Sequence, residues 1–171
     1  LHLAGETTQV RRRALESVAY ACIPEVMDAL ETAYYHEDEQ VRLSAMVGMG
    51  RTCDNRWTKI ILEELENESP AMRYEAALAS GHLALRSAVP ILTRLLDDAD
   101  PQVRDAVIWS LGQIGGDQAK QALLAALEYA DEDTAAALED ALAEQALSDG
   151  DLDFPLYEFK DSTGDPDEDA Y

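Results

Sequence analysis

Four arginines recur at a constant interval along the chain, and they are the first residues whose spacing could serve chemistry. Each stands 31 positions after the one before: Arg11, Arg42, Arg73 and Arg104. Guanidinium groups bind phosphate and carboxylate through paired hydrogen bonds, so the row could form an anion site. Acidic residues precede the last three arginines, which instead favours a structural ladder of ion pairs between repeats. We favour the ladder and keep the anion site as the alternative.

The two cysteines occupy one position of the same repeat, because Cys22 and Cys53 are separated by the same interval. A redox pair or a metal site could use such a position. Equivalent positions of stacked helices lie about 8–10 Å apart, whereas a disulfide needs Cα atoms within about 7 Å. We therefore predict two reduced, buried thiols that act as small apolar side chains.

The remaining polar residues show no catalytic or metal-binding pattern. The histidines are His2, His36 and His82, and the pair His36-Glu37 occurs once, between repeats. The sequence has no glycine-rich phosphate loop and no Ser/His/Asp grouping. We predict no catalytic residue, no metal and no cofactor.

The same interval carries apolar positions, so these residues belong to repeated helices. Apolar or small residues recur four, five, eight and nine positions after Val10, Val41, Met72 and Val103, as on one helix face. A second apolar pattern follows in each unit, and Ser69-Pro70 and Asp100-Pro101 mark helix starts. The predicted helices are 10–22, 24–35, 40–52, 56–66, 70–84, 88–96, 101–114, 118–128 and 133–147.

These pairs of helices predict an all-α fold. One pair cannot bury its apolar face alone, and stacking of neighbouring pairs supplies the core. We predict a right-handed α-solenoid of about four and a half repeats over residues 1–147. Residues 148–171 form a separate acidic-aromatic tail.

The segment Asp100-Pro-Gln-Val-Arg-Asp-Ala-Val-Ile-Trp-Ser-Leu-Gly112 carries the clearest form of the repeat. It resembles the short bacterial HEAT-like repeat of the type found in phycobilisome bilin lyases, and the resemblance covers about residues 4–147. It implies that the arginine row is structural. It also implies that the second helix of each pair lines the concave face of the solenoid.

Two HEAT-like enzyme classes do not fit the residues. The di-iron deoxyhypusine hydroxylases place His-Glu pairs early in the first helices, where this chain has Leu43-Ser44, Tyr74-Glu75 and Asp105-Ala106. The HEAT-like DNA glycosylases need a basic groove, whereas the residues before 149 have 12 bases and 26 acids, a net charge of −14.

The expected concave face supplies the candidate binding residues. Its polar positions, taken from the second helices, are mostly acidic and favour a basic or amphipathic segment of another protein. The alternative is an ordinary solvated face. The candidates are Tyr35, Glu63, Glu66, Arg94, Asp97 and Glu128.

The C-terminal tail is a second candidate binding element. Residues 149–171 contain nine acids and one lysine, with large apolar residues interleaved. Such a segment is typical of docking motifs that order on a surface, and the alternative is a solubilising tail. The expected intramolecular dock is the edge of the last helix, around Leu138, Leu142 and Leu147. The apolar residues of the tail are Leu152, Phe154, Leu156, Tyr157 and Phe159.

The overall charge reduces the number of possible functions further. The chain has 171 residues and a net charge of −22, which disfavours binding to nucleic acid or anionic membranes. No readable secretory signal opens the sequence, so we expect a cytoplasmic protein. The sequence therefore favours a non-enzymatic scaffold that binds a protein through its concave acidic face, its tail, or both. The alternative is a bilin-lyase-like subunit that handles a tetrapyrrole and its acceptor protein.

Overall fold

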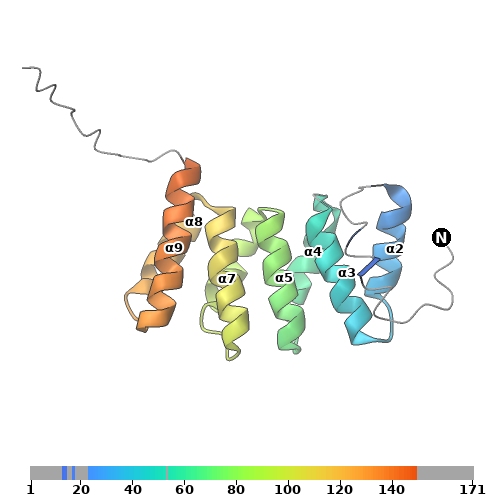
Figure 1. Cartoon of the computed structure of the whole chain (residues 1–171), viewed down its shortest axis with the longest axis horizontal. Coiled ribbons are helices and arrows are strands. Elements are labelled where there is room, and N and C mark those ends of the chain that lie inside the picture. Colours follow the sequence, from blue (N-terminus) through green and yellow to red (C-terminus); the bar gives the residue numbers. More distant parts are fainter. Residues whose placement is uncertain (1–12, 15–16, 18–22, 53, 150–171) are drawn as a thin grey trace, which may run out of the picture.

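A computed structural model describes residues 13–14, 17, 23–52 and 54–149, and within them the chain forms eight α-helices and no strand (Figure 1). This confirms the predicted all-α architecture. Three-residue 3₁₀ turns, Asn55–Trp57 and Arg86–Ala88, lead into the two shortest helices. The helices are α2 (Pro24–Tyr34), α3 (Glu39–Arg51), α4 (Thr58–Glu64), α5 (Pro70–His82), α6 (Val89–Leu95), α7 (Pro101–Ile114), α8 (Gly116–Leu127) and α9 (Glu132–Asp149).

The helix starts follow the signals in the sequence. Asp38 accepts a hydrogen bond from the backbone N–H of Gln40 at 2.8 Å, and Asp100 accepts one from that of Gln102 at 2.8 Å. These carboxylates satisfy backbone donors that have no partner inside the helix. Ser69 precedes α5 but makes no such cap; its hydroxyl donates to Glu39 Oε1 at 2.7 Å and so links two repeats.

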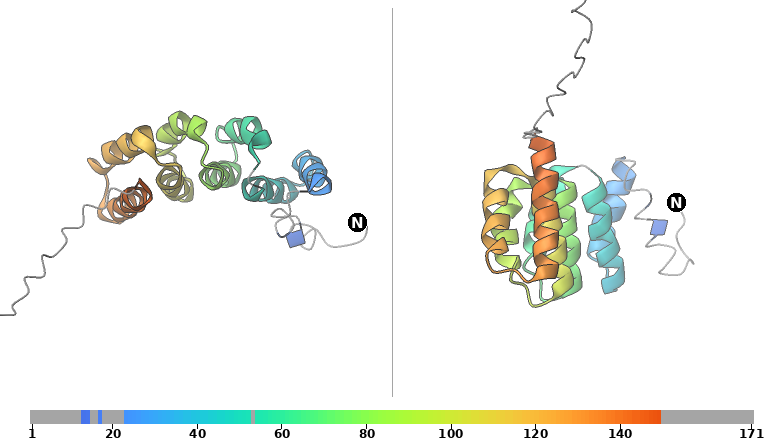
Figure 2. Two further views of the ribbon diagram at one scale, coloured as in Figure 1. Left: turned by 90° about the horizontal axis from the view of Figure 1, so that it is seen from above. Right: turned by 60° about the vertical axis from the view of Figure 1, so that its left-hand side comes forward.

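The helices form two rows. The inner row consists of α3, α5, α7 and α9, which pack side by side along their length. The outer row consists of α2, α4, α6 and α8, whose members make few direct contacts with one another. Viewed along the helices, the stack is an arch with the inner row on its concave side (Figure 2).

Small residues set the close spacing of the inner row. A Cβ atom added to Gly50 would lie 2.8 Å from the Cα of Ala79, and one added to Gly112 would lie 3.0 Å from the Cβ of Ala141. At the equivalent Gly81, the added atom would meet Ser110 Cα at 3.0 Å. Helices of the inner row can approach this closely because glycine has no side chain at the contact.

This arrangement corrects the expected orientation. The second helix of each sequence unit lies in the outer row, on the convex side, so the expectation that these helices line the concave face was wrong. Glycine, alanine and serine bring the inner helices together, whereas the outer helices make few direct contacts with one another. The stack therefore bends toward the inner row.

The core lies between the two rows. Large apolar side chains from both rows are fully buried there, and burying each contributes about 1.5–3 kcal/mol. Ala76, in the middle of α5, is also fully buried. The largest of these side chains are Leu30, Met46, Met49, Ile61, Leu65, Leu92, Leu111, Leu123 and Leu138.

The last helix differs from the edge that the sequence predicted. Leu138 is fully buried and Leu142 is half-buried, so they do not form an open apolar edge with Leu147, which is 58% exposed. At the position of the buried Ile108, α9 carries the exposed Glu139. Residues 150–171, and with them the predicted docking segment, lie outside the described residues.

Candidate protein-interaction groove

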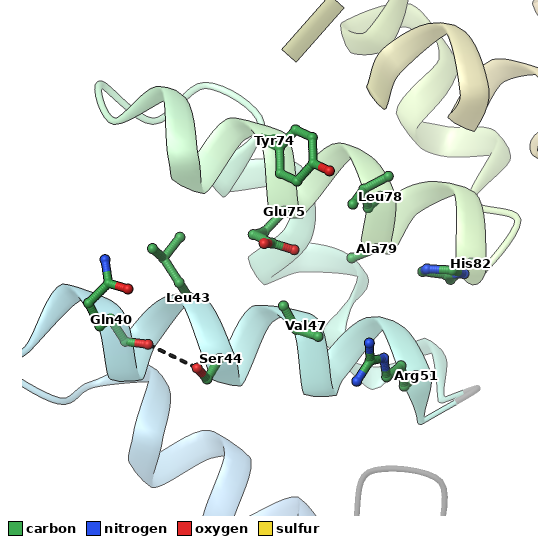
Figure 3. Close-up of a pocket in the computed structure, with 10 residues that line it drawn as sticks. All are labelled: Gln40, Leu43, Ser44, Val47, Arg51, Tyr74, Glu75, Leu78, Ala79 and His82. Atoms are coloured by element: carbon green, nitrogen blue, oxygen red, sulfur yellow. Dashed lines mark hydrogen bonds between the residues drawn. The ribbon is translucent and has the colours of Figure 1, made fainter. Parts of the chain in front are cut away.

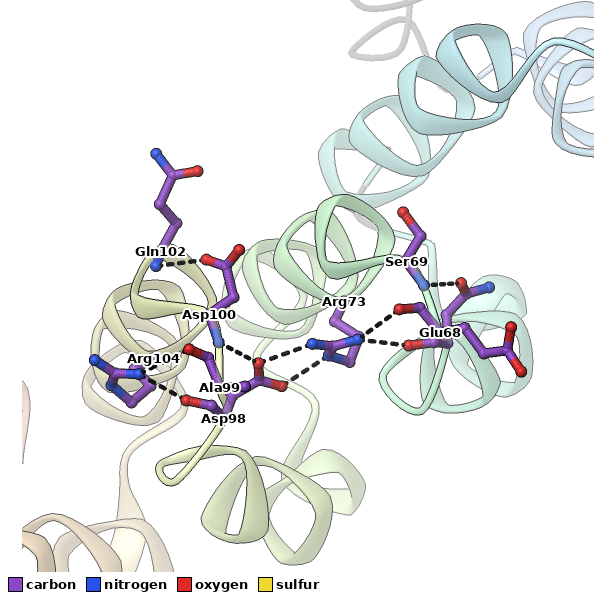
Figure 4. Close-up of polar contacts among 9 residues, drawn as sticks. Glu68, Ser69, Arg73, Asp98, Ala99, Asp100, Gln102 and Arg104 are labelled. Carbon is purple, nitrogen blue, oxygen red and sulfur yellow. Dashed lines mark hydrogen bonds and ion pairs between the residues drawn. The ribbon is translucent and has the colours of Figure 1, made fainter.

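The described arginines of the repeated row donate hydrogen bonds to the loops that lead into the inner helices. The Nη1 of Arg73 donates to the carbonyl oxygens of Asn67 and Glu68, at 2.8 and 3.0 Å (Figure 4). Arg42 and Arg104 make the equivalent pairs of bonds to carbonyls five and six positions upstream. Each of these guanidinium groups thus satisfies backbone acceptors beyond the end of an outer helix. Arg11, Cys22 and Cys53 lie outside the described residues.

One arginine of the row also forms an ion pair. Arg73 binds Asp98 in a bidentate manner, Nε to Oδ2 at 2.7 Å and Nη2 to Oδ1 at 2.8 Å, with side chains 15% and 5% exposed. The bonds from Arg73 lower the pKa of Asp98, although burial opposes this, and the backbone N–H of Asp100 adds to the lowering. The equivalent position is Asn67 in the preceding repeat and Tyr129 in the following one, so neighbouring repeats lack this acid.

The binding residues proposed from the sequence lie on the outer helices or just after their ends, and none belongs to the inner row. Glu66 and Arg94 form an exposed ion pair there, Lys59 pairs with Glu63 at 3.7 Å, and Tyr35 is 72% exposed. Asp97 and Glu128 are exposed in the same row. The structure joins Glu66 to Arg94 but gathers no shared pocket from the set. Phe154, Leu156, Tyr157 and Phe159 lie outside the described residues.

A row of buried and half-buried apolar side chains crosses the concave face, and we call it the apolar stripe. It consists of Leu43 and Val47 on α3, Tyr74 and Leu78 on α5, and Trp109 on α7. Leu43 is the most buried of the five, and the other four are partly exposed to solvent.

The stripe lies in a groove. Between α3 and α5 the groove has a volume of about 500 Å³, with Gln40, Glu75 and His82 among its polar lining residues (Figure 3). A neighbouring hollow of about 400 Å³ lies between α5 and α7 and is lined by Tyr74, Asp105 and Trp109. The groove therefore runs across the helices of the inner row.

Polar groups line one edge of the groove, the edge that consists of the last turns of the inner helices. The ring of His82 packs edge-on against Trp109, with centroids 4.9 Å apart. Burial lowers the pKa of His82, and the charge of Arg51 lowers it further, so His82 is neutral at pH 7. At neutral pH this part of the groove wall is thus an uncharged aromatic pair beside one guanidinium group.

The sequence contains a signal for the stripe that was missed. Val47, Leu78 and Trp109 recur at the interval of the repeat, and they form an apolar position beyond those needed for the core. The expectation that the outer helices line the concave face leaves this extra apolar position without a role.

Two further findings concern the described residues alone. Among them, no three His, Cys, Asp or Glu side chains gather in a way that could hold a metal ion. No helix in this part of the chain is both long and apolar enough to cross a membrane.

Comparison with known proteins agrees with this architecture. The sequence profile of HEAT repeats matches residues 58–143, half of the chain. The chain belongs to the HEAT repeat family. The resemblance identified from the sequence is thereby confirmed. A comparison with curated protein sequences gave no match.

Solved HEAT-like structures share the fold. The complex of CpcE and CpcF of phycocyanin lyase from Nostoc sp. PCC7120 matches with a TM-score of 0.66 and 22% identity, over 85% of this chain. This chain spans 62% of the length of that protein. Human deoxyhypusine hydroxylase matches with a TM-score of 0.54 and 18% identity, over 85% of this chain and 71% of the other. At these identities the likeness concerns the fold.

Proposed function

We propose that this HEAT-repeat chain is a non-enzymatic adaptor that binds a segment of another protein in the groove of its concave face. The observation that carries the proposal is the apolar stripe. Five apolar side chains from three neighbouring helices of the inner row line a groove on a chain with a net charge of −22.

The composition of the stripe suits protein recognition. Tryptophan and tyrosine are enriched among the residues that dominate binding energy at protein interfaces. Trp109 and Tyr74 are both partly exposed and lie beside aliphatic neighbours. A partner that covers them removes apolar surface from water, which is the main favourable contribution to most protein association.

The test compares a groove variant with an outer-row variant. Leu78→Gln places an amide in the groove, whereas Tyr35→Ala changes an exposed side chain at the end of the outer helix α2. Both proteins are first checked for native helix content by circular dichroism. Affinity purification from the native source with mass spectrometry should recover a partner with wild type and Tyr35→Ala, and lose it with Leu78→Gln. Recovery of the same partners with Leu78→Gln would contradict the proposal.

The tail remains a proposed second contact. Five large apolar residues within eight positions favour docking on a hydrophobic surface rather than a purely solubilising role. Repeating the purification without residues 149–171 tests this. A partner that is lost without the tail, while the groove is intact, assigns the tail to binding.

A bilin-lyase-like subunit is the second candidate. The fold likeness to the CpcE and CpcF complex supports it, and Tyr74 and Trp109 offer aromatic surface in the groove. Absorbance spectra of the purified protein mixed with a bilin give a direct test. A shifted bilin spectrum that is lost in Leu78→Gln favours this candidate, and an unchanged spectrum counts against it.

A further inference from the structure

We propose that the segment bound in the groove is amphipathic and directional, with large apolar side chains over α3, α5 and α7 and basic residues over α9. This inference rests on the proposed function and names the chemistry of the partner.

The register of α9 is the first step. Gly112 meets Ala141 as Gly50 meets Ala79, and the separation along the sequence is the same in both pairs. The last inner helix therefore packs on α7 in the same register as α5 packs on α3. Side chains at equivalent positions of α9 face the concave side as they do in the other inner helices.

The chemistry of the concave face changes at α9. One repeat further along the chain, Asp140 takes the position of Trp109, and Glu144 takes that of Gln113. Asp133, at the equivalent of Gln102, adds a third acid, and all three side chains are exposed. The apolar stripe therefore ends at α7 and continues as an acidic surface.

The groove is consequently most acidic at α9, although Glu75 on α5 and Asp105 on α7 each add one acid to its lining. The sequence of α9 contains six acids and no lysine or arginine. The opposite end, on α3, carries Arg51. Electrostatic complementarity sets the register and orientation of bound partners, so a segment with basic residues at one end fits the groove in one direction.

The dimensions of the inner row suggest the length of the segment. Neighbouring helices pack about 8–10 Å apart, so the distance from α3 to α9 is about 24–30 Å. A helical segment rises about 1.5 Å per residue and needs about 16–20 residues to span it. The apolar residues that contact successive inner helices are then spaced about five to seven positions apart.

Charge argues against two other occupants. The tail of this chain, residues 149–171, has a net charge of −8 and would meet the acids of α9. A second copy of the chain carries −22 and is repelled in the same way. A basic, amphipathic segment of a different protein is the complementary occupant.

Selection from a display library of random 20-residue peptides tests the inference on the full chain, in 0.15 M salt. The baits are wild type, Asp140→Lys with Glu144→Lys, and a control of equal charge, Asp28→Lys with Glu31→Lys. The two control residues are exposed on the outer helix α2. Wild type and control should select peptides with spaced apolar residues and Lys or Arg at one end. The α9 variant should bind these peptides at least tenfold more weakly.

Orientation is measured with a spin label on either end of a selected peptide. A label on the basic end should broaden the NMR signals of α9, and a label on the other end should broaden those of α3. The reverse pattern overturns the inference. So does binding that is equally weakened by the control variant, or that strengthens when residues 150–171 are removed.

Leu78→Gln separates failure of the inference from failure of the proposed function. Peptides that need Leu78 but carry no basic end overturn the direction and leave the groove as a binding site. Selection that is unchanged by Leu78→Gln, or that yields no enriched peptide, overturns both the directional inference and the proposed binding function of the groove.

Discussion

Replacing Gly50 by alanine tests how the inner row is held together. The added Cβ would lie 2.8 Å from the Cα and 2.9 Å from the Cβ of Ala79. Carbon atoms in contact are about 3.5–4.0 Å apart, so α3 and α5 must separate by about 1 Å. The obstacle is backbone and cannot move away by side-chain rotation.

Two opposing contributions decide the size of the effect. Alanine is favoured over glycine within a helix by about 1 kcal/mol. Overpacking of a close contact costs about 1–3 kcal/mol, and the upper part of this range applies because the neighbour is backbone. We expect Gly50→Ala to lower the free energy of unfolding by about 1–2 kcal/mol. For a chain of this size the Tm should fall by about 2–8 °C.

Urea and thermal unfolding followed by circular dichroism at 222 nm measure this directly. Gly112→Ala should cost less than Gly50→Ala, because its added Cβ lies 3.0 Å or more from its neighbours. Ala143→Gly is the matched control: Ala143 is the exposed equivalent in α9, and its replacement should cost only about 1 kcal/mol of helix propensity. A Gly50→Ala protein as stable as wild type, or more stable, would refute the packing argument.

Three further predictions concern stability and thiol chemistry. Ala76→Leu should destabilise by about 1–3 kcal/mol through overpacking at a fully buried site, and an unchanged Tm would contradict this. Asp98→Asn should lower stability at pH 7 by about 1.5–3 kcal/mol. Because the folded-state pKa of Asp98 is depressed, its contribution is present above the usual pKa of aspartate and disappears as pH falls through the depressed value. Denaturation at pH 2–7 should therefore show the two proteins converging at low pH, and a constant difference would count against the role of the Arg73 ion pair. Cys22 and Cys53 should both be alkylated after denaturation without reductant, and mass spectrometry that finds a disulfide would overturn that prediction.

The helices could be predicted from the sequence because their signals are local. The predicted helix 101–114 has the bounds of α7, since Asp100 and Pro101 fix its start and Gly115, with a φ of 64°, ends it. The predicted helix 56–66 was less accurate. In the structure a 3₁₀ turn occupies Asn55–Trp57, and α4 covers only Thr58–Glu64. Periodicity alone does not distinguish the two kinds of helical turn.

The side of the solenoid that forms the groove could not be predicted in this way. It depends on which row of helices approaches more closely, and that comparison involves residues in different repeats. Gly50, Gly81 and Gly112 were visible in the sequence as a repeated position near the helix ends. Such small residues are expected to let neighbouring helices approach closely, but the row that they draw together is seen only when Ala79, Ser110 and Ala141 are found opposite them. The acidic face of α9 depends on the same register.

The contacts of Gly50, Gly81 and Gly112 also bear on how such a chain can change during evolution. Each glycine faces alanine or serine in the next inner helix, and the pattern returns once in every repeat. An in-frame duplication or deletion of one 31-residue repeat between α3 and α7 again places a glycine opposite a small residue of the neighbouring inner helix. The new junction thus keeps the close contact between a glycine and a small residue of the neighbouring inner helix. Recombination can therefore lengthen or shorten the groove by one apolar position at a time while leaving the terminal acidic helix in place.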